Sequence, residues 1–469
     1  MASSYAKQSF SFICFAVAAL LILPSQSFGQ DNGGGTGTGG TVGNSSIFLG
    51  VVGGVSVDAD KVVRGEYRSL PATDQQRVRE ALTKADADIK SEASMRMISL
   101  RGLEAAISGA TKSGKPLPAD VQYMAGLQRL EYVILSPDTN DIILAGPGEG
   151  WTLNEEGNVV GIKSGMPVLH LQDFMVAMRS VDSARQGRGV SVSIDPTQKG
   201  VQAVQQIFDR MARNRTSFVN ASLKNEIADA CGDQTVTLTG VPRDSHFSRV
   251  LLTADYKMKR LAMGLDESPI RKLPSMMSQI ARKKIKLNKR EIPRMWMECD
   301  YEPVAKSSDN NIWKISGKGV RVQTETELAA ANGQRSGSGK KLKVAEDWAE
   351  NMTKQYDALS AKEPVFRDLR NVMDMSVVAA IIRNEGLTKQ VGLSLPMIGD
   401  ELETPSYTVP EKIPSQVSVA GAYAVQVSGG VLLDSWGAAR NTVESKELGE
   451  VATVAKVATA DRWWWNAKQ

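Results

Sequence analysis

Histidine and cysteine are scarce in this chain of 469 residues, which has two histidines and three cysteines. His170 and His246 lie far apart in the sequence and no cysteines cluster near them, so the ligand spacing typical of a zinc site is absent. Packing explains His170, and helix capping beside Ser245 explains His246 better than a catalytic triad does. The sequence therefore predicts no metal and no cofactor.

The small number of cysteines also excludes a dense disulfide framework. Cys14 lies within an apolar N-terminal run, which leaves Cys231 and Cys299 for the rest of the chain. In an exported protein these two residues permit one disulfide, and two separate buried thiols explain them equally well. Both interpretations stay open at the level of the sequence.

Long apolar runs without charge are missing after the N-terminus. Residues 12–23 form an apolar run behind Lys7, and small residues lead up to Gly29. The run is shorter than the roughly 20 residues that span a bilayer, so it is typical of a secretory signal peptide, cleaved here near Gly29. The most apolar later segment, 372–382, is interrupted by Asp374. We therefore expect an exported protein, periplasmic or extracellular, without a transmembrane span.

Charge of one sign is not in large excess. Lys and Arg number 56 against 52 Asp and Glu, a formal net charge of +4, which does not indicate a nucleic-acid-binding protein. The glycine cluster Gly146–Gly150 follows an apolar run as a nucleotide-binding loop would. However, Pro147 lacks an amide donor and no helix pattern follows directly. We interpret these glycines as a tight turn.

The patterns that are present predict helices and strands in mixed order. Two β-branched runs around Pro137 predict a hairpin over 130–146, and residues 172–181 read as a helix. Apolar residues at spacings of three and four predict a helix from Asp244 to Gly264, and strict alternation predicts a strand over 294–304. Gly429-Gly430 reads as a break between two short strands.

This order favours an α+β fold with mainly antiparallel strands over a doubly wound parallel sheet. We expect two packed domains, the first containing the hairpin. The expected division is a signal peptide (1–29), a Gly-rich flexible segment (30–56), a first α+β domain (57–215), a second α+β domain (216–435) and a polar tail (436–469) that ends in a Trp triplet.

The enzymatic hypothesis rests on the strand over 294–304. Glu298, Asp300 and Glu302 would share one face, and residues two apart on a strand stand about 7 Å apart, within the range of carboxylate pairs in glycoside hydrolases. The same acids suit a calcium ion, or they simply face solvent.

The binding hypothesis rests on a basic segment between residues 282 and 290. Its cations are Arg282, Lys283, Lys284, Lys286, Lys289 and Arg290. In an exported protein their partner would be an anionic envelope polymer, a lipid headgroup or another envelope protein; a solvated helix face is the alternative. We expect Trp463–Trp465 to dock onto the protein's own surface or onto a partner, because an exposed triplet would be adhesive.

Several segments resemble a family of exported planctomycete proteins catalogued as a domain of unknown function. The resemblance is carried by Tyr132–Thr139, Leu144–Trp151, Ala254–Lys259, Pro364–Asn371 and Trp463–Trp465, among others. It implies export and assigns no reaction and no site residues. The leading hypothesis is an exported, non-enzymatic structural or binding protein of the cell envelope. The alternative is a hydrolase of an envelope polymer that uses Glu298, Asp300 or Glu302.

Overall fold

The computed structural model describes most of the chain after residue 87. The described residues are 80, 87–154, 158–216, 218–288, 290–399, 407, 409–421, 423–449, 451 and 462–467. The expected signal peptide and Gly-rich segment lie outside them. All of the described residues belong to one compact unit, Ser45–Gln469, whose α+β character confirms the predicted fold class.

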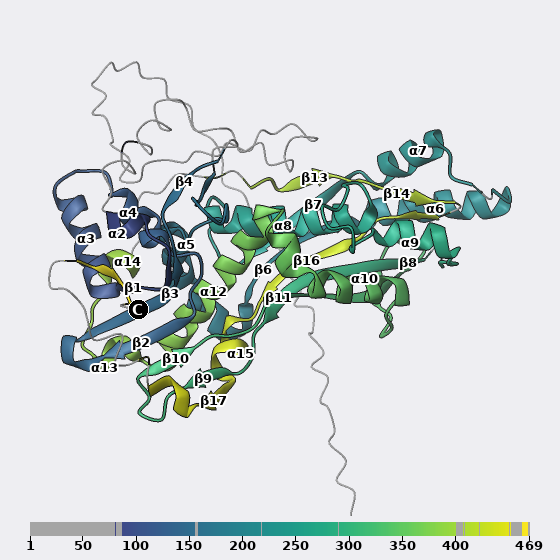
Figure 1. Cartoon of the computed structure of the whole chain (residues 1–469). Coiled ribbons are helices and arrows are strands. Elements are labelled where there is room, and N and C mark those ends of the chain that lie inside the picture. Colours follow the sequence, from purple (N-terminus) through teal and green to yellow (C-terminus); the bar gives the residue numbers. More distant parts are fainter. Residues whose placement is uncertain are drawn as a thin grey trace, which may run out of the picture. The chain divides into compact units, whose positions relative to one another are not determined.

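The first of two seven-stranded sheets is built around the predicted hairpin (Figure 1). β2 (Tyr132–Ser136) and β3 (Asp141–Gly148) pair antiparallel from Tyr132 opposite Ala145 to Ser136 opposite Asp141, so the hairpin is confirmed. Asn140 closes the turn at a φ of 51°, a conformation that asparagine tolerates well. The sheet order is β17 (Thr442–Glu444), β9 (Val304–Lys306), β10 (Ile312–Lys314), β2, β3, β1 (Ala93–Ser99) and β18 (Trp464–Asn466).

The second sheet contains the predicted alternating strand. β8 (Glu291–Asp300) buries Met295 and Met297, while the residues between them are half-buried on the other face. Its order is β12 (Arg335–Gly337), β11 (Gly319–Ala329), β8, β16 (Ser428–Leu433), β6 (Val190–Pro196), β7 (Asp233–Thr239) and β13 (Lys412–Pro414). β16 runs parallel to β8 and antiparallel to β6, so the sheet is mixed.

The expected strand break at Gly429-Gly430 is wrong. Both glycines lie inside β16, where its two neighbours approach closely. A Cβ atom at Gly429 would lie 1.8 Å from the carbonyl oxygen of Met295 on β8, and one at Gly430 would lie 1.7 Å from that of Val192 on β6. The glycines therefore allow close packing in the middle of a strand, a role that turn-like composition hides.

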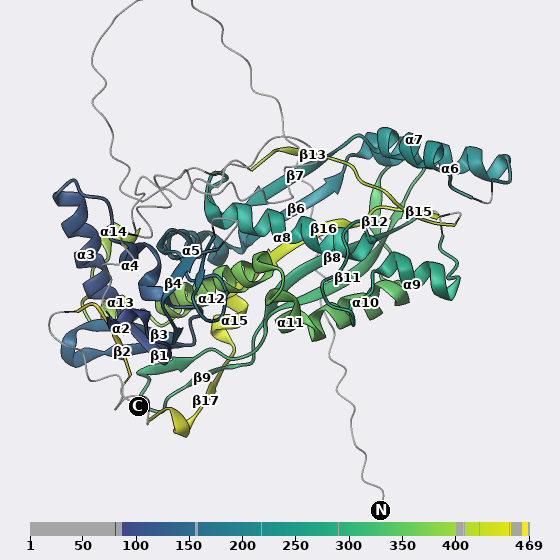
Figure 2. The same cartoon turned by 45° about the horizontal axis from the view of Figure 1, so that its top comes forward.

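Helices join the two sheets through one continuous core. α12 (Pro364–Asn384) is buried along most of its length and packs against α5 (Leu171–Ser183), α8 (His246–Met263) and α15 (Ser435–Arg440) (Figures 1 and 2). The predicted helices over 172–181 and 244–264 are confirmed as α5 and α8. The other α-helices of five or more described residues are α3 (Leu100–Lys112), α6 (Gln198–Arg213), α7 (Ala221–Cys231), α9 (Met276–Lys283), α10 (Lys343–Lys354) and α11 (Tyr356–Ser360).

The expected domain boundary at residue 215 stays a prediction. β6 and β7, which come from either side of it, pair directly within the second sheet.

In the part of the chain that the structure describes, no helix combines the length and apolar character needed to cross a membrane.

The C-terminal tryptophans dock onto the protein's own surface, which was one of the two arrangements expected from the sequence. β18 is the edge strand of the first sheet and pairs antiparallel with β1, with Trp464 opposite Ile98. Trp464 and Trp465 keep only 5% and 7% of their surface exposed. The guanidinium of Arg96 lies 5.6 Å from the centre of the Trp464 ring, and its Nε donates to Asn466 Oδ1 at 2.8 Å. The triplet therefore completes a sheet edge.

Candidate functional site

The carboxylates of β8 are held in a cross-strand network. Glu298 accepts hydrogen bonds from Trp296 Nε1 at 2.8 Å and from Gln323 Nε2 at 3.2 Å, and it lies 2.6 Å from Arg321 Nη2 on β11. Glu302 lies beyond the end of the strand at Asp300, so the expectation that three acids share one strand face is wrong for Glu302. Glu298 acts here as a partner of Arg321, which gives the hydrolase hypothesis no support.

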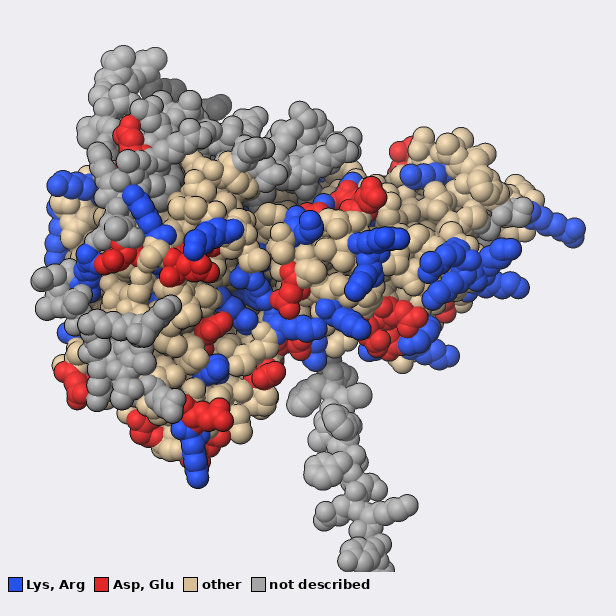
Figure 3. Space-filling model, viewed as in Figure 1, with Lys and Arg blue, Asp and Glu red and all other residues tan. Residues whose placement is uncertain are grey.

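The basic segment is exposed. α9 ends at Lys283, and Lys284 follows at a φ of 51°, which turns the chain out of the helix. Arg282, Lys283, Lys284, Lys286 and Arg290 are all exposed, while Lys289 lies outside the described residues. Figure 3 shows Lys and Arg side chains gathered over α9. None of the five forms an ion pair with an acid of the described chain, so their charge is available to a partner.

An apolar cavity lies beside this segment. It measures about 60 Å³, and together with its open mouth the hollow holds about 680 Å³. The enclosed part is therefore smaller than the roughly 300–1,000 Å³ of a typical small-molecule site, and the rest of the hollow is open to solvent. Leu287 and Ile292, which flank the last basic residues, form part of the wall. Other lining residues include Val204 and Phe208 of α6, Ile227 and Cys231 of α7, Val417 and Val425, together with the polar residues Gln205, Asn288, Glu291 and Gln426.

The two remaining cysteines are both free thiols, so the disulfide left open by the sequence does not form. Cys231 lines the apolar cavity, and burial raises the pKa of its thiol to about 11. Burial also raises the pKa of Cys299. Neither residue has the lowered pKa of a catalytic thiol.

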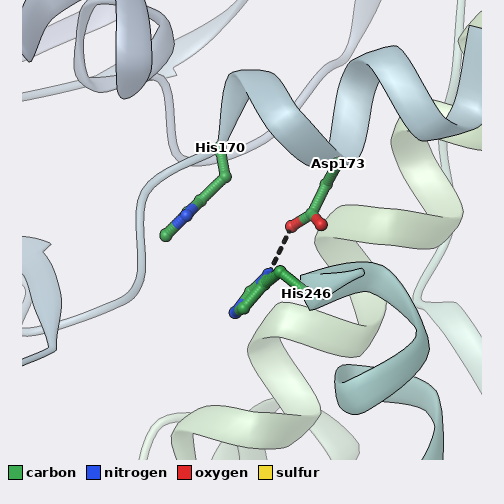
Figure 4. A group of neighbouring side chains, drawn as sticks. All are labelled: His170, Asp173 and His246. Atoms are coloured by element: carbon green, nitrogen blue, oxygen red, sulfur yellow. Dashed lines mark hydrogen bonds and ion pairs between the residues drawn. The ribbon is translucent and has the colours of Figure 1, made fainter. Parts of the chain in front are cut away.

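A third site, absent from the sequence-based hypotheses, is formed by His170, Asp173 and His246 (Figure 4). His170 is the N-cap residue of α5, Asp173 lies in the first turn of that helix, and His246 is the first residue of α8. Ser245 caps α8 by accepting from the Ser248 backbone N–H at 3.1 Å, as predicted. The two helix starts bring the three side chains together.

The geometry of this cluster is close. His246 Nδ1 lies 2.7 Å from Asp173 Oδ2. The rings of His170 and His246 stack with their centres 4.8 Å apart and their planes 7° from parallel. One ligand atom from each of the three residues lies within 4.8 Å of the others. Packing and helix capping explain the two histidines separately at the level of the sequence, whereas the fold brings their rings into contact.

Burial and neighbouring charges shift the pKa values of the two imidazole rings in opposite directions. Burial, with the neighbouring His246, lowers the pKa of His170 to about 4. Burial also lowers the pKa of His246, but the Asp173 carboxylate and its hydrogen bond, with Asp368, outweigh this and raise it. Burial raises the pKa of Asp368 itself to about 7. At neutral pH His170 is therefore a neutral imidazole with a lone pair to donate.

Two tyrosines enclose the histidines. Tyr123 meets the His170 ring edge-on at 5.4 Å, and Tyr407 meets the His246 ring at 5.2 Å. The Tyr407 backbone N–H donates to Asp244 O at 2.8 Å, which holds Tyr407 near the start of α8. Imidazole and carboxylate groups in such surroundings suit either a transition-metal ion or a His–Asp acid–base pair. The only sequence signal was the spacing of His170 and Asp173 at a helix start.

Comparison with known proteins gives one family match. The family model described as "Protein of unknown function (DUF1598)" matches residues 192–276, a segment from β6 to the start of α9 that includes His246 and all of α8. No curated protein and no solved structure is significantly similar to the chain. The comparisons therefore support similarity to a domain of unknown function and indicate no specific activity.

Proposed function

We propose that this protein is exported and binds an anionic lipid of the cell envelope. The single observation that carries the binding proposal is the position of the apolar cavity directly beside the exposed basic segment, with Leu287 and Ile292 in the cavity wall. Export is supported by the N-terminal sequence and by the resemblance to exported planctomycete proteins. An anionic polymer or a second envelope protein would use the basic segment without needing the cavity.

Two kinds of contact would act together in this site. Lysine and arginine near an anionic surface contribute about 1 kcal/mol each, and this contribution weakens as salt rises. An acyl chain in the cavity would contribute about 0.8 kcal/mol for each buried methylene. The cation cluster therefore explains attraction to the headgroup, and the cavity explains preference for a ligand that carries an apolar chain.

Binding can be tested with dodecyl phosphate against inorganic phosphate, and with vesicles of phosphatidylglycerol against vesicles of phosphatidylcholine. The test variant replaces Arg282, Lys283, Lys284, Lys286 and Arg290 by Gln. The matched control replaces five exposed lysines elsewhere by Gln, at Lys112, Lys115, Lys362, Lys389 and Lys412. We expect the test variant alone to lose at least tenfold in affinity for dodecyl phosphate.

The cavity has its own variant, Ala424→Met, which adds volume at the lining. We expect it to weaken binding of dodecyl phosphate while leaving adsorption to the vesicle surface unchanged. Equal affinity of wild type and the five-Gln variant for dodecyl phosphate would exclude the proposal. Equal retention of phosphate, dodecyl phosphate and a polyanionic polysaccharide would instead indicate a polymer-binding surface.

Export is tested separately, by N-terminal sequencing of the protein recovered from its native cells. We expect the mature chain to begin near Gln30 and to titrate two thiols in denaturant, Cys231 and Cys299. A chain that retains Cys14 and titrates three would contradict cleavage near Gly29.

A further inference from the structure

We propose that His170, Asp173 and His246 form a binding site for one divalent transition-metal ion of the zinc class. The site is independent of the basic segment and the apolar cavity, and it shares no residue with either. The proposal assigns the three side chains as ligands and leaves at least one further coordination position for a water molecule or another donor.

The composition of the cluster is the first argument. The chain has two histidines in 469 residues, and the fold stacks both against each other with a carboxylate in hydrogen-bond contact. Two imidazoles and one carboxylate form a ligand set suited to zinc, cobalt, nickel or iron(II), whereas calcium and magnesium prefer oxygen ligands alone. The residue types thus select the class of ion.

Distances are the second argument. Zinc binds imidazole nitrogen and carboxylate oxygen at about 2.0–2.2 Å, so two ligand atoms on one ion can be no more than about 4.2 Å apart. His246 Nδ1 and Asp173 Oδ2 lie 2.7 Å apart in a hydrogen bond whose proton an ion would displace, and one ligand atom from each of the three residues lies within 4.8 Å of the others. A movement of about 1 Å would bring all three within range.

An unsatisfied polar atom is the third argument. Asp173 is 3% exposed, and its second carboxylate oxygen, Oδ1, is buried without a hydrogen-bond partner among the described residues. Buried polar atoms are normally satisfied, so an atom without a partner in this position points to a ligand. A cation bound through Oδ1, or through both oxygens, would satisfy this atom.

The surroundings can hold the charge and admit the ion. Asp173 lies in the site, the nearby Asp368 adds a second negative charge when it ionises, and Arg249 is the opposing cation near Tyr407. His170 keeps partial exposure, whereas Asp173 and His246 are buried, so an ion would enter past the His170 ring. A hydrogen-bonded His–Asp pair that only packs the core is the competing explanation.

The experiment uses full-length protein without a histidine tag and with ¹⁵N-labelled histidine. Because both histidines of the chain belong to the cluster, every ring-nitrogen signal reports on the site. Addition of Zn²⁺ is expected to shift the signals of both rings with a stoichiometry of one ion per chain. Addition of Co²⁺ is expected to produce visible ligand-field absorption. These measurements on the wild type need no variant and do not depend on any variant folding.

Three variants then assign the ligands. His170→Gln, Asp173→Asn and His246→Gln are each expected to weaken Zn²⁺ binding at least tenfold and to abolish the rise in Tm that Zn²⁺ gives the wild type. Asp182→Asn is the matched control, since Asp182 lies on the same helix and is half exposed. Ring signals that do not move at saturating Zn²⁺, or Zn²⁺ binding that survives in the His170→Gln/His246→Gln protein, would exclude the site.

Discussion

Arg129 Nε lies 2.9 Å from Asp374 Oδ2, and the aspartate is completely buried. Tyr301 donates from its hydroxyl to the other carboxylate oxygen at 2.7 Å, while Arg129 Nη2 donates to Gly317 O at 3.0 Å. The pair links the segment before β2 to the middle of α12 and to the chain that follows β8. Asp374 is the charge that interrupts the most apolar segment after the N-terminal run, and this network explains its presence there.

Asp374→Ala should destabilise the protein by about 3–5 kcal/mol, because it leaves the Arg129 guanidinium in the core without its carboxylate. Urea unfolding followed by tryptophan fluorescence measures the change. Asp182→Ala is the control, since Asp182 pairs with Arg383 on the surface and both side chains are about half exposed. We expect the control to cost about 0–1 kcal/mol. Equal costs for the two variants would mean that Arg129 finds another partner.

Trp465→Ala should cost about 3–5 kcal/mol, because Trp465 packs with Met97 and Ile143 on one face of the first sheet. Val443→Ala is the control on β17 at the opposite edge of that sheet, where Val443 is exposed. A change within about 0.5 kcal/mol is expected there. The unfolding midpoint in urea distinguishes the two, and a small effect at Trp465 would show that β18 contributes little to stability.

Gly430→Ala should prevent normal pairing of β16, because the added Cβ would lie 1.7 Å from the carbonyl oxygen of Val192. The conflict is with backbone, so rotation of a side chain cannot relieve it. Gly109→Ala is the control, and it is expected to change the stability in the opposite direction. Gly109 lies on α3 with no atom near the new methyl group, so alanine should stabilise the helix by about 1 kcal/mol. Thermal melts of both variants show whether each substitution lowers or raises the melting temperature.

Cys231 should react slowly with thiol reagents in the folded protein. Burial raises its pKa to about 11, so at pH 8 about one thiol in a thousand is ionised, against about one in four for an unperturbed cysteine. The raised value means that the reactive thiolate is scarce below pH 11 and increases about tenfold per pH unit towards it.

Iodoacetamide labelling followed by peptide mass spectrometry measures this rate, with denatured protein as the reference. Labelling of Cys231 at pH 8 should be about a hundredfold slower in the folded state. Dodecyl phosphate should slow it further, because Cys231 lines the cavity. Rapid labelling at pH 8 would indicate that the cavity opens readily to solvent.

Local patterns in the sequence predicted the elements that depend on neighbouring residues. The hairpin of β2 and β3 depends on a turn at Pro137, and α8 depends on its own apolar spacing and its Ser245 cap. The basic segment was also recognisable, because its charges are consecutive. These features follow from interactions within about 20 residues of chain.

Features formed by distant residues could not be read in the same way. The contact between His170 and His246 exists because the starts of α5 and α8 converge, and no local pattern encodes that convergence. The role of Gly430 depends on Val192, which belongs to a strand more than 200 residues earlier. The Cβ that glycine lacks matters only once both neighbouring strands are in place.

The position of β16 also constrains the order in which the protein can fold. β16 separates β8 from β6 in the second sheet, yet it comes from residues 428–433, and the first sheet is completed by residues 464–466. Neither sheet can be completed until nearly all of the chain is available, and pairings between such distant residues form slowly. A chain with this topology therefore remains incompletely folded until residues 464–466 have been synthesised.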